Sequence, residues 1–329
     1  MQTDMTVGKP MKMILDFTIP VFIGNVFQQF YNMADAIIVG KFVGTKGLAA
    51  VGSTGTIMFL IIGFLTGLTA GFTVLTSQKF GAGKMDEMRQ SVGNAAILSI
   101  IISMIMTAVS MVGMRALLTL MHTPEDIFND AYTYIMIICG GIFAQVLYNI
   151  LASILRALGN SKTPLYFLIL AALLNVALDL IFIIAFHMGV AGAAWATITA
   201  QGVSGALCLV YIIKCVPELR LKSNDWRLRP EIARKEILVG IPMGLQYSIT
   251  AIGTMMVQSA LNLLGSISVA AFTAASKIEQ IVTQAYVALG TAMATYCAQN
   301  SGAGDVQRSG MDFVQRQFLA QCTRLWLRY

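Results

Sequence analysis

Hydrophobic residues run along this chain in long blocks that contain almost no charge. The blocks cover residues 17–40, 47–78, 91–114, 131–155, 163–186, 188–213 and 237–276, and a last block continues to about residue 300. A helix needs about 20 apolar residues to cross a bilayer. The block 237–276 is too long for one helix and is interrupted at Leu264-Gly265-Ser266. The pattern therefore predicts eight membrane-spanning helices, without the ten-residue alternation that β-barrel strands show.

The composition excludes a soluble domain, because 57% of the residues are hydrophobic and only 12% are charged. Soluble proteins carry about a quarter charged residues. The first block is longer than the apolar core of a signal peptide and no small-residue cleavage site follows it, so we expect it to be retained. The five cysteines form no C-x-x-C pair and have no histidine companions, which favours a packing role over metal or redox chemistry.

The net charge of +6 is explained by topology. If the N-terminus is cytoplasmic, the inner loops before the last block carry fourteen Lys and Arg residues and the outer loops carry three. This bias follows the positive-inside rule. We therefore expect a multi-pass protein of the plasma (inner) membrane with a cytoplasmic N-terminus, in contact with the lipid bilayer and with no nucleic acid.

Two carboxylates lie inside predicted spans, and each has other polar residues near it on the same helix. The first span is apolar apart from residues that step by 3, 1, 3 and 3 along one helical stripe: Asn25, Gln28, Gln29, Asn32 and Asp35. In the fifth span, Asn175 lies one turn before Asp179. A carboxylate in hydrocarbon costs about 2.5 kcal/mol or more and usually marks a proton or cation pathway. The pattern favours a transporter, although an interhelical hydrogen bond that only holds the bundle together would also explain Asn175 and Asp179.

An internal repeat relates the two ends of the chain. Residues 77–83 correspond to residues 298–304 at an offset of 221, and Pro20 corresponds to Pro242 within one residue. Both copies follow an even-numbered span, which predicts a parallel repeat of six spans, one of the known transporter plans.

The repeat predicts four parts. They are a first six-helix lobe (1–213), a cytoplasmic linker (214–236) with a short surface helix over 230–235, a partial second lobe of two spans (237–304), and a polar tail (305–329) that does not span. Because the repeat fails abruptly after residue 304, we expect a C-terminally truncated chain with an aberrant tail; a natural amphipathic tail on the membrane surface is the alternative.

Four motifs in order carry a family resemblance: N-M-A-D-A-I-I-V-G at 32–40, R-A-L-G-N-S-K-T-P at 156–164, L-N-V-A-L-D at 174–179 and Q-N-S-G-A-G at 299–304. Over residues 10–304 the chain resembles the MATE (multidrug and toxic compound extrusion) transporters, and within them the DinF-like branch. The resemblance implies an all-α polytopic membrane protein with a six-helix first lobe and a second, repeat-related lobe. It implies export of organic cations or other amphipathic compounds in exchange for H⁺ or Na⁺.

The resemblance also implies functional residues. It places a cation-coupling site in the first lobe, with Na⁺ possible at Asp35 and Asp179; the residues are Asp35, Asn175, Asp179, Thr197 and Tyr134. Together with the polar stripes of spans 1 and 7, it predicts a substrate cavity lined by Asn25, Gln28, Asn32, Gln246, Thr250 and Gln258. The NorM-like pattern would have an acid near Thr250, and none stands between Glu236 and Glu279.

Two other functions remain open: a lipid-linked precursor flippase of the same superfamily, and a non-transporting truncated membrane protein. A flippase would need a strongly cationic cavity, whereas we expect acids and no buried arginine in the spans of the first lobe. No metal cluster, serine–histidine pair or nucleotide loop indicates an enzyme. We expect a monomer with no cofactor other than its coupling ion.

Overall fold

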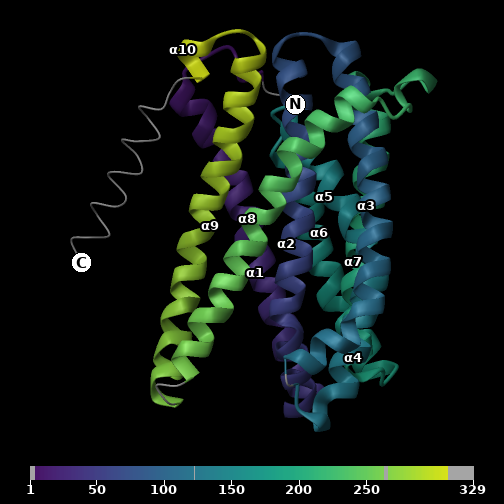
Figure 1. The fold of residues 1–329 in the computed structure, drawn as a ribbon, viewed down its shortest axis with the longest axis vertical. Helices are drawn as coiled ribbons and strands as arrows, with labels where there is room; N and C mark the ends of the chain where they lie inside the picture. The colour runs from purple at the N-terminus through teal and green to yellow at the C-terminus, as the bar shows by residue number, and fades with distance from the viewer. Residues whose placement is uncertain (1–3, 122, 263–265, 310–329) are drawn as a thin grey trace.

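The computed structural model describes residues 4–121, 123–262 and 266–309, without the side chains of residues 255, 258–278, 306 and 309. It is an elongated bundle whose long helices run side by side (Figure 1). The helices are α1 (Pro10–Phe42), α2 (Thr45–Gly81), α3 (Met85–Leu120), α4 (Glu125–Gly140), α5 (Ile142–Ala157), α6 (Lys162–Asp179), α7 (Gly189–Cys215), α8 (Pro230–Asn262), α9 (Ser266–Gly302) and α10 (Val306–Ser309). We call the end where α1, α3 and α8 begin the N-terminal end of the bundle.

The described helices confirm the expected all-α membrane fold. Six of them are long and apolar enough to cross a membrane, and the pair α4 and α5 adds a seventh if it counts as one span. Along α3, large apolar side chains are exposed on the outside of the bundle, as a lipid-facing surface requires; they are Ile101, Met104, Ile105, Val109 and Val112.

The predicted span 131–155 is not one straight helix, because the chain bends by 47° between α4 and α5. The bend falls at Gly140 and Gly141, and adjacent glycines are a common cause of helix kinks. A Cβ on Gly141 would lie 2.3 Å from the side chain of Ile198 in α7. The absence of a side chain at Gly141 therefore lets Ile198 of α7 pack directly against the backbone at the bend.

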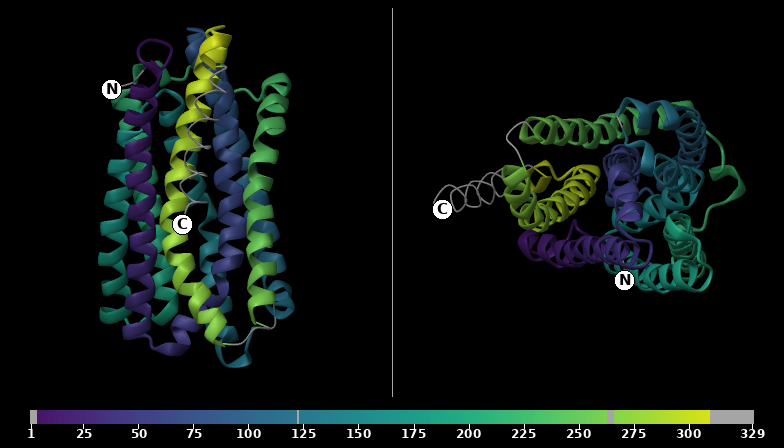
Figure 2. Two further views of the ribbon diagram at one scale, coloured as in Figure 1. Left: turned by 90° about the vertical axis from the view of Figure 1, so that its left-hand side faces the viewer. Right: turned by 90° about the horizontal axis from the view of Figure 1, so that it is seen from below.

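Helices α8 and α9 pack against the first six spans mainly through α2 and α1 (Figure 2). A Cβ on Gly71 of α2 would lie 2.4 Å from the Cα of Gly240 in α8, and one on Gly67 would lie 2.4 Å from the backbone oxygen of Met243. Small residues let membrane helices approach backbone to backbone in this way. We call this glycine-lined contact the α2–α8 seam.

A second close contact joins α2 to α9 at the N-terminal end. A Cβ on Gly81 would lie 2.0 Å from the backbone oxygen of Gln299, and a Cβ on Gly302 would lie 1.9 Å from the backbone oxygen of Gln78. Gln299 and Gly302 are the residues at the repeat offset of 221 from Gln78 and Gly81. The contact is therefore reciprocal, because the glycine of each copy meets the glutamine of the other copy. A two-fold axis produces such reciprocal contacts, so the geometry agrees with the predicted parallel repeat.

The linker differs from its expected form. Residues 230–235 are not a separate surface helix but the first turns of α8, which runs on without a break from Pro230. The preceding segment also docks on α3: Asn94 Oδ1 accepts from the backbone N–H of Arg229 at 2.7 Å, and Asn94 Nδ2 donates to the backbone oxygen of Arg227 at 3.2 Å. Its docking fixes where α8 begins.

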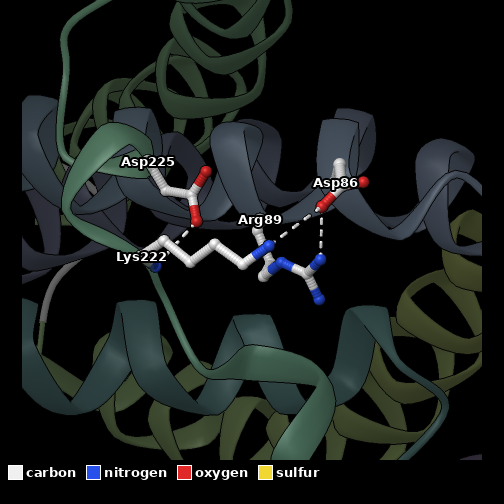
Figure 3. A network of polar contacts seen from close by, with 4 residues as sticks. All are labelled: Asp86, Arg89, Lys222 and Asp225. Carbon is white, nitrogen blue, oxygen red and sulfur yellow. Dashed lines mark hydrogen bonds and ion pairs between the residues drawn. The ribbon is translucent and has the colours of Figure 1, made fainter.

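Charged side chains add to this docking (Figure 3). Asp86 of α3 pairs with Arg89 and lies 3.9 Å from Lys222 Nζ, while the Asp225 carboxylate accepts from the Lys222 backbone N–H at 2.8 Å. Asp86 and Lys222 are largely exposed, so their pairing contributes little to stability. The network orients the linker more than it stabilises the fold.

Candidate functional site

The fold brings the two predicted acids together from distant parts of the sequence. Asp35 lies in the last third of α1 and Asp179 is the final residue of α6. Their side chains interact with each other. Asp179 is fully buried and Asp35 is 8% exposed. The pair lies in the half of the bundle away from the N-terminal end.

The amide and hydroxyl expected beside the acids are present in the same place. Asn175 and Thr197 are both buried. Asn175 Nδ2 on α6 donates to Thr197 Oγ1 on α7 at 3.3 Å. This bond uses one of the two N–H donors of the amide, and the amide oxygen has no hydrogen-bond partner among the described residues.

Two tyrosines complete the surroundings. Tyr134 on α4 is buried and lies within electrostatic range of both Asp35 and Asp179. Tyr31 on α1 interacts with the side chains of Gln201 on α7 and Gln28 on its own helix. We call the set of Tyr31, Asp35, Tyr134, Asn175, Asp179, Thr197 and Gln201 the acid cluster.

Tyr31 and Gln201 were not among the residues predicted from the sequence. A signal was available for both, because Tyr31 precedes Asp35 by four residues and Gln201 follows Thr197 by four. Residues at this spacing lie on one face of a helix. The polar stripe of span 1 therefore includes an amphipathic aromatic residue that a search for amides and acids overlooks.

Several buried oxygens of the acid cluster have no hydrogen-bond partner in the described part of the chain. They are Asp35 Oδ1, Asn175 Oδ1, Asp179 Oδ1 and Asp179 Oδ2. Buried polar atoms are normally satisfied, so such a group of acceptors needs an explanation. A cation that prefers oxygen ligands would satisfy several of them at once, and a proton shared between the two carboxyl groups would satisfy two.

The chain changes its winding directly after Asp179. Residues Leu180–Ala185 form a π-helix, which packs against α7 and α1. Short π-helical turns inside membrane helices occur frequently at functional sites. The run Leu-Ile-Phe-Ile-Ile-Ala has no glycine or proline, so the sequence carried no signal for this change.

The residues predicted to line a substrate cavity are only partly brought together. Asn25 is half-buried, Gln28 and Asn32 are exposed on α1, and Gln246 and Thr250 are exposed on α8. Thr250 Oγ1 donates to the backbone oxygen of Gln246 at 2.9 Å, so its hydroxyl is held within its own helix. The side chain of Gln258 lies outside the described residues. The cavity stays a prediction.

One expectation about charge needs correction. Arg156 is not confined to a loop but lies in the last turn of α5, half-buried, and donates to Ser153 Oγ at 3.1 Å. Its charge interacts with Tyr148 on α5 and Tyr247 on α8. The spans of the first lobe therefore contain a partly buried cation as well as the acids.

The MatE family model matches residues 20–181 and 242–325 of this chain. The "Probable multidrug resistance protein YpnP" of Bacillus subtilis is 33% identical over 307 residues, which are 93% of this chain and 68% of that protein. The "FAD transporter" of Shewanella oneidensis is 24% identical, over 91% of this chain and 67% of that protein. The chain thus spans about two thirds of the length of these curated relatives.

Solved structures show the same fold. A structure described as the outward-facing conformation of a multidrug resistance MATE family transporter of the MOP superfamily superposes with a TM-score of 0.90 at 26% identity, covering 98% of this chain and 72% of that one. A MOP superfamily transporter from Pyrococcus furiosus, described as having a binding pocket of reverse polarity, superposes equally well, with a TM-score of 0.90 and 26% identity. The arrangement of the spans and the matches over nearly the whole sequence lead to one assignment: the chain belongs to the MatE family, a family of membrane transporters.

Proposed function

We propose that this protein is a secondary active antiporter that exports organic cations or other amphipathic compounds in exchange for H⁺ or Na⁺. The proposal rests on the acid cluster, in which two buried carboxyl groups interact and four acceptor oxygens have no hydrogen-bond partner among the described residues. Two unit charges 4 Å apart repel by about 4 kcal/mol at an effective dielectric constant of 20. A cation shared by Asp35 and Asp179 removes this repulsion.

Occupancy of the acid cluster can change the position of α1. With a cation present, Asp35 of α1 is held against Asp179 of α6; without it, the two carboxylates repel. Pro20 inside α1 lacks a backbone N–H and gives the helix a point at which it can bend. The release of the cation thereby favours one access state over the other, which is the coupling that an antiporter needs.

The orientation supports export. We place the N-terminal end of the bundle in the cytoplasm because most basic loop residues cluster there. The acid cluster then lies nearer the outer face of the plasma (inner) membrane. We propose a monomer as the working unit, with the coupling ion as its only cofactor.

The test is gradient-driven efflux of a fluorescent cationic dye from proteoliposomes that contain a full-length version of the protein, with all the spans of both lobes. We expect Asp35→Asn and Asp179→Asn each to abolish the response to a pH or Na⁺ gradient. Asp130→Asn is the matched control, because Asp130 is an exposed acid of α4 and should leave efflux unchanged. Efflux by the two cluster variants at the control rate would remove the acid cluster from the mechanism.

Arg156 favours a second candidate, a flippase for lipid-linked precursors or a carrier of another anionic compound. Its guanidinium interacts electrostatically with Tyr247 on α8 as well as with Tyr148 on its own helix, so an anion between the lobes could meet it. One relative is named an FAD transporter, and FAD is an anionic compound. Transport of an anionic dye that Arg156→Gln abolishes, with no transport of the cationic dye, would favour this candidate over the first.

A further inference from the structure

A second buried acid lies far from the acid cluster, at the N-terminal end of the bundle. Glu236 stands in the second turn of α8 and its side chain is 1% exposed. It lies on the same face of α8 as Gly240 and Gly244, at intervals of four residues, and this face forms the α2–α8 seam. The acid is thus enclosed where the first helix of the second lobe meets the first lobe.

A short chain of hydroxyl groups leads to Glu236 from two helices of the first lobe. Thr76 on α2 and Ser91 on α3 are fully buried, and their side-chain oxygens lie 3.0 Å apart. Ser91 Oγ donates to Glu236 Oε1 at 2.8 Å. The other carboxyl oxygen, Oε2, is buried and has no hydrogen-bond partner among the described residues.

The charged side chains near this end of the bundle form ion pairs with other residues or are exposed. Lys79 of α2 pairs with Glu87 of α3, Arg89 pairs with Asp86, and Lys222 approaches Asp86. On α8 itself, Glu231, Arg234 and Lys235 are exposed. In the described part of the chain Glu236 has no ion pair, and Ser91 is its one hydrogen-bond partner.

This environment suits a neutral carboxylic acid. A buried carboxylate without a cation loses its hydration and gains one hydrogen bond from a hydroxyl group. The free energy of this bond is much smaller than the free energy of hydration that the carboxylate loses. A protonated acid loses much less, and its carbonyl oxygen can still accept from Ser91. The packed arrangement of α2, α3 and α8 therefore favours the form that holds a proton.

We propose that Glu236 is a proton-binding site of the contact between the lobes, separate from the acid cluster. The carboxyl keeps its proton while α8 is packed on α2 and α3. When α8 moves away and water reaches the side chain, the O–H bond breaks, the proton passes to water, and the carboxylate is solvated. The link between this opening and the transport cycle rests on the proposed function, whereas the proton-binding site does not depend on that function.

Infrared spectroscopy of the purified chain in lipid nanodiscs tests the proton directly. At neutral pH, Glu236→Gln should remove one carbonyl stretch of a protonated carboxylic acid, whereas Glu231→Gln, which changes an exposed acid of the same helix, should remove none. Ser91→Ala should shift the same band to higher frequency, because its carbonyl loses a donor. This variant keeps the test available if Glu236→Gln does not fold.

A spectrum of Glu236→Gln identical to that of the unaltered protein at neutral pH would overturn the proposal, as would a band that Ser91→Ala leaves unmoved. The double variant Asp35→Asn with Asp179→Asn should retain the band that Glu236→Gln removes. If the double variant loses transport and keeps this band, both proposals stand. If it keeps transport as well as the band, only the proposed function fails.

A distance measurement links the proton to the opening of the lobes. Spin labels at Lys84 and Arg234, both exposed, report the separation of α3 and α8 at the N-terminal end. Raising the pH should add a population at longer distance in the unaltered protein, and Glu236→Gln should remain at the short distance throughout. The same pH response in Glu236→Gln would contradict the proposal.

Discussion

The α2–α8 seam allows a quantitative prediction for Gly71→Ala. The added Cβ would lie 2.4 Å from Gly240 Cα and 2.9 Å from Gly240 N. Nonbonded carbon atoms rest about 3.5–4.0 Å apart, so α8 has to move away by roughly 1 Å. Both clashing atoms belong to the backbone, and no rotamer change can relieve them.

Overpacking of this kind costs about 1–3 kcal/mol. In detergent, the midpoint of thermal unfolding should therefore fall by several degrees, since 1 kcal/mol corresponds to about 2–4 °C in a protein of 150–250 residues. Gly55→Ala is the matched control on the same helix, because a Cβ there has no neighbour within 4 Å. It should leave the midpoint unchanged or raise it slightly, as alanine favours helices over glycine by about 1 kcal/mol.

Equal midpoints for the two variants would refute the close approach of α2 and α8. The α2–α8 distance, measured between labels on the two helices, provides a second readout. It should increase in Gly71→Ala and stay constant in Gly55→Ala. A lower midpoint with no change in this distance would show that the destabilisation has another origin.

Three further predictions concern other contacts. Gly81→Ala and Gly302→Ala should each lower the unfolding midpoint, and their double variant should lose less than the sum, because both open the same α2–α9 contact; strict additivity would argue against that coupling. Asn94→Ala should speed tryptic cleavage in the linker, since it removes two hydrogen bonds to the linker backbone, and unchanged cleavage would show that the linker is held by other contacts. Tyr31→Phe should weaken gradient-driven dye efflux without lowering the unfolding midpoint, because it removes only the hydroxyl that meets Gln201; full efflux would exclude that hydroxyl from coupling.

The sequence by itself determined the features that depend on local composition. Membrane helices form wherever about 20 apolar residues follow one another, because a backbone in lipid must satisfy its own hydrogen bonds. Most of the predicted spans and the polar stripe that ends at Asp35 could therefore be read directly. The predicted interruption around Gly265 lies outside the described residues. The repeat was readable for the same reason, since Gly81 and Gly302 occupy equivalent places in two copies of one pattern.

Contacts between helices were decided only by the tertiary structure. The family resemblance placed Asp35 and Asp179 in one site, but nothing in the local sequence says that Tyr31 meets Gln201, or that Arg156 lies half-buried in the last turn of a helix and not in a loop. The same holds for Glu236, which looked like the last charge of a solvated linker. It is a buried acid because α8 begins at residue 230 and packs on α2 and α3. Hydropathy fixes which segments are helices, whereas the burial of one side chain depends on which other helix covers it.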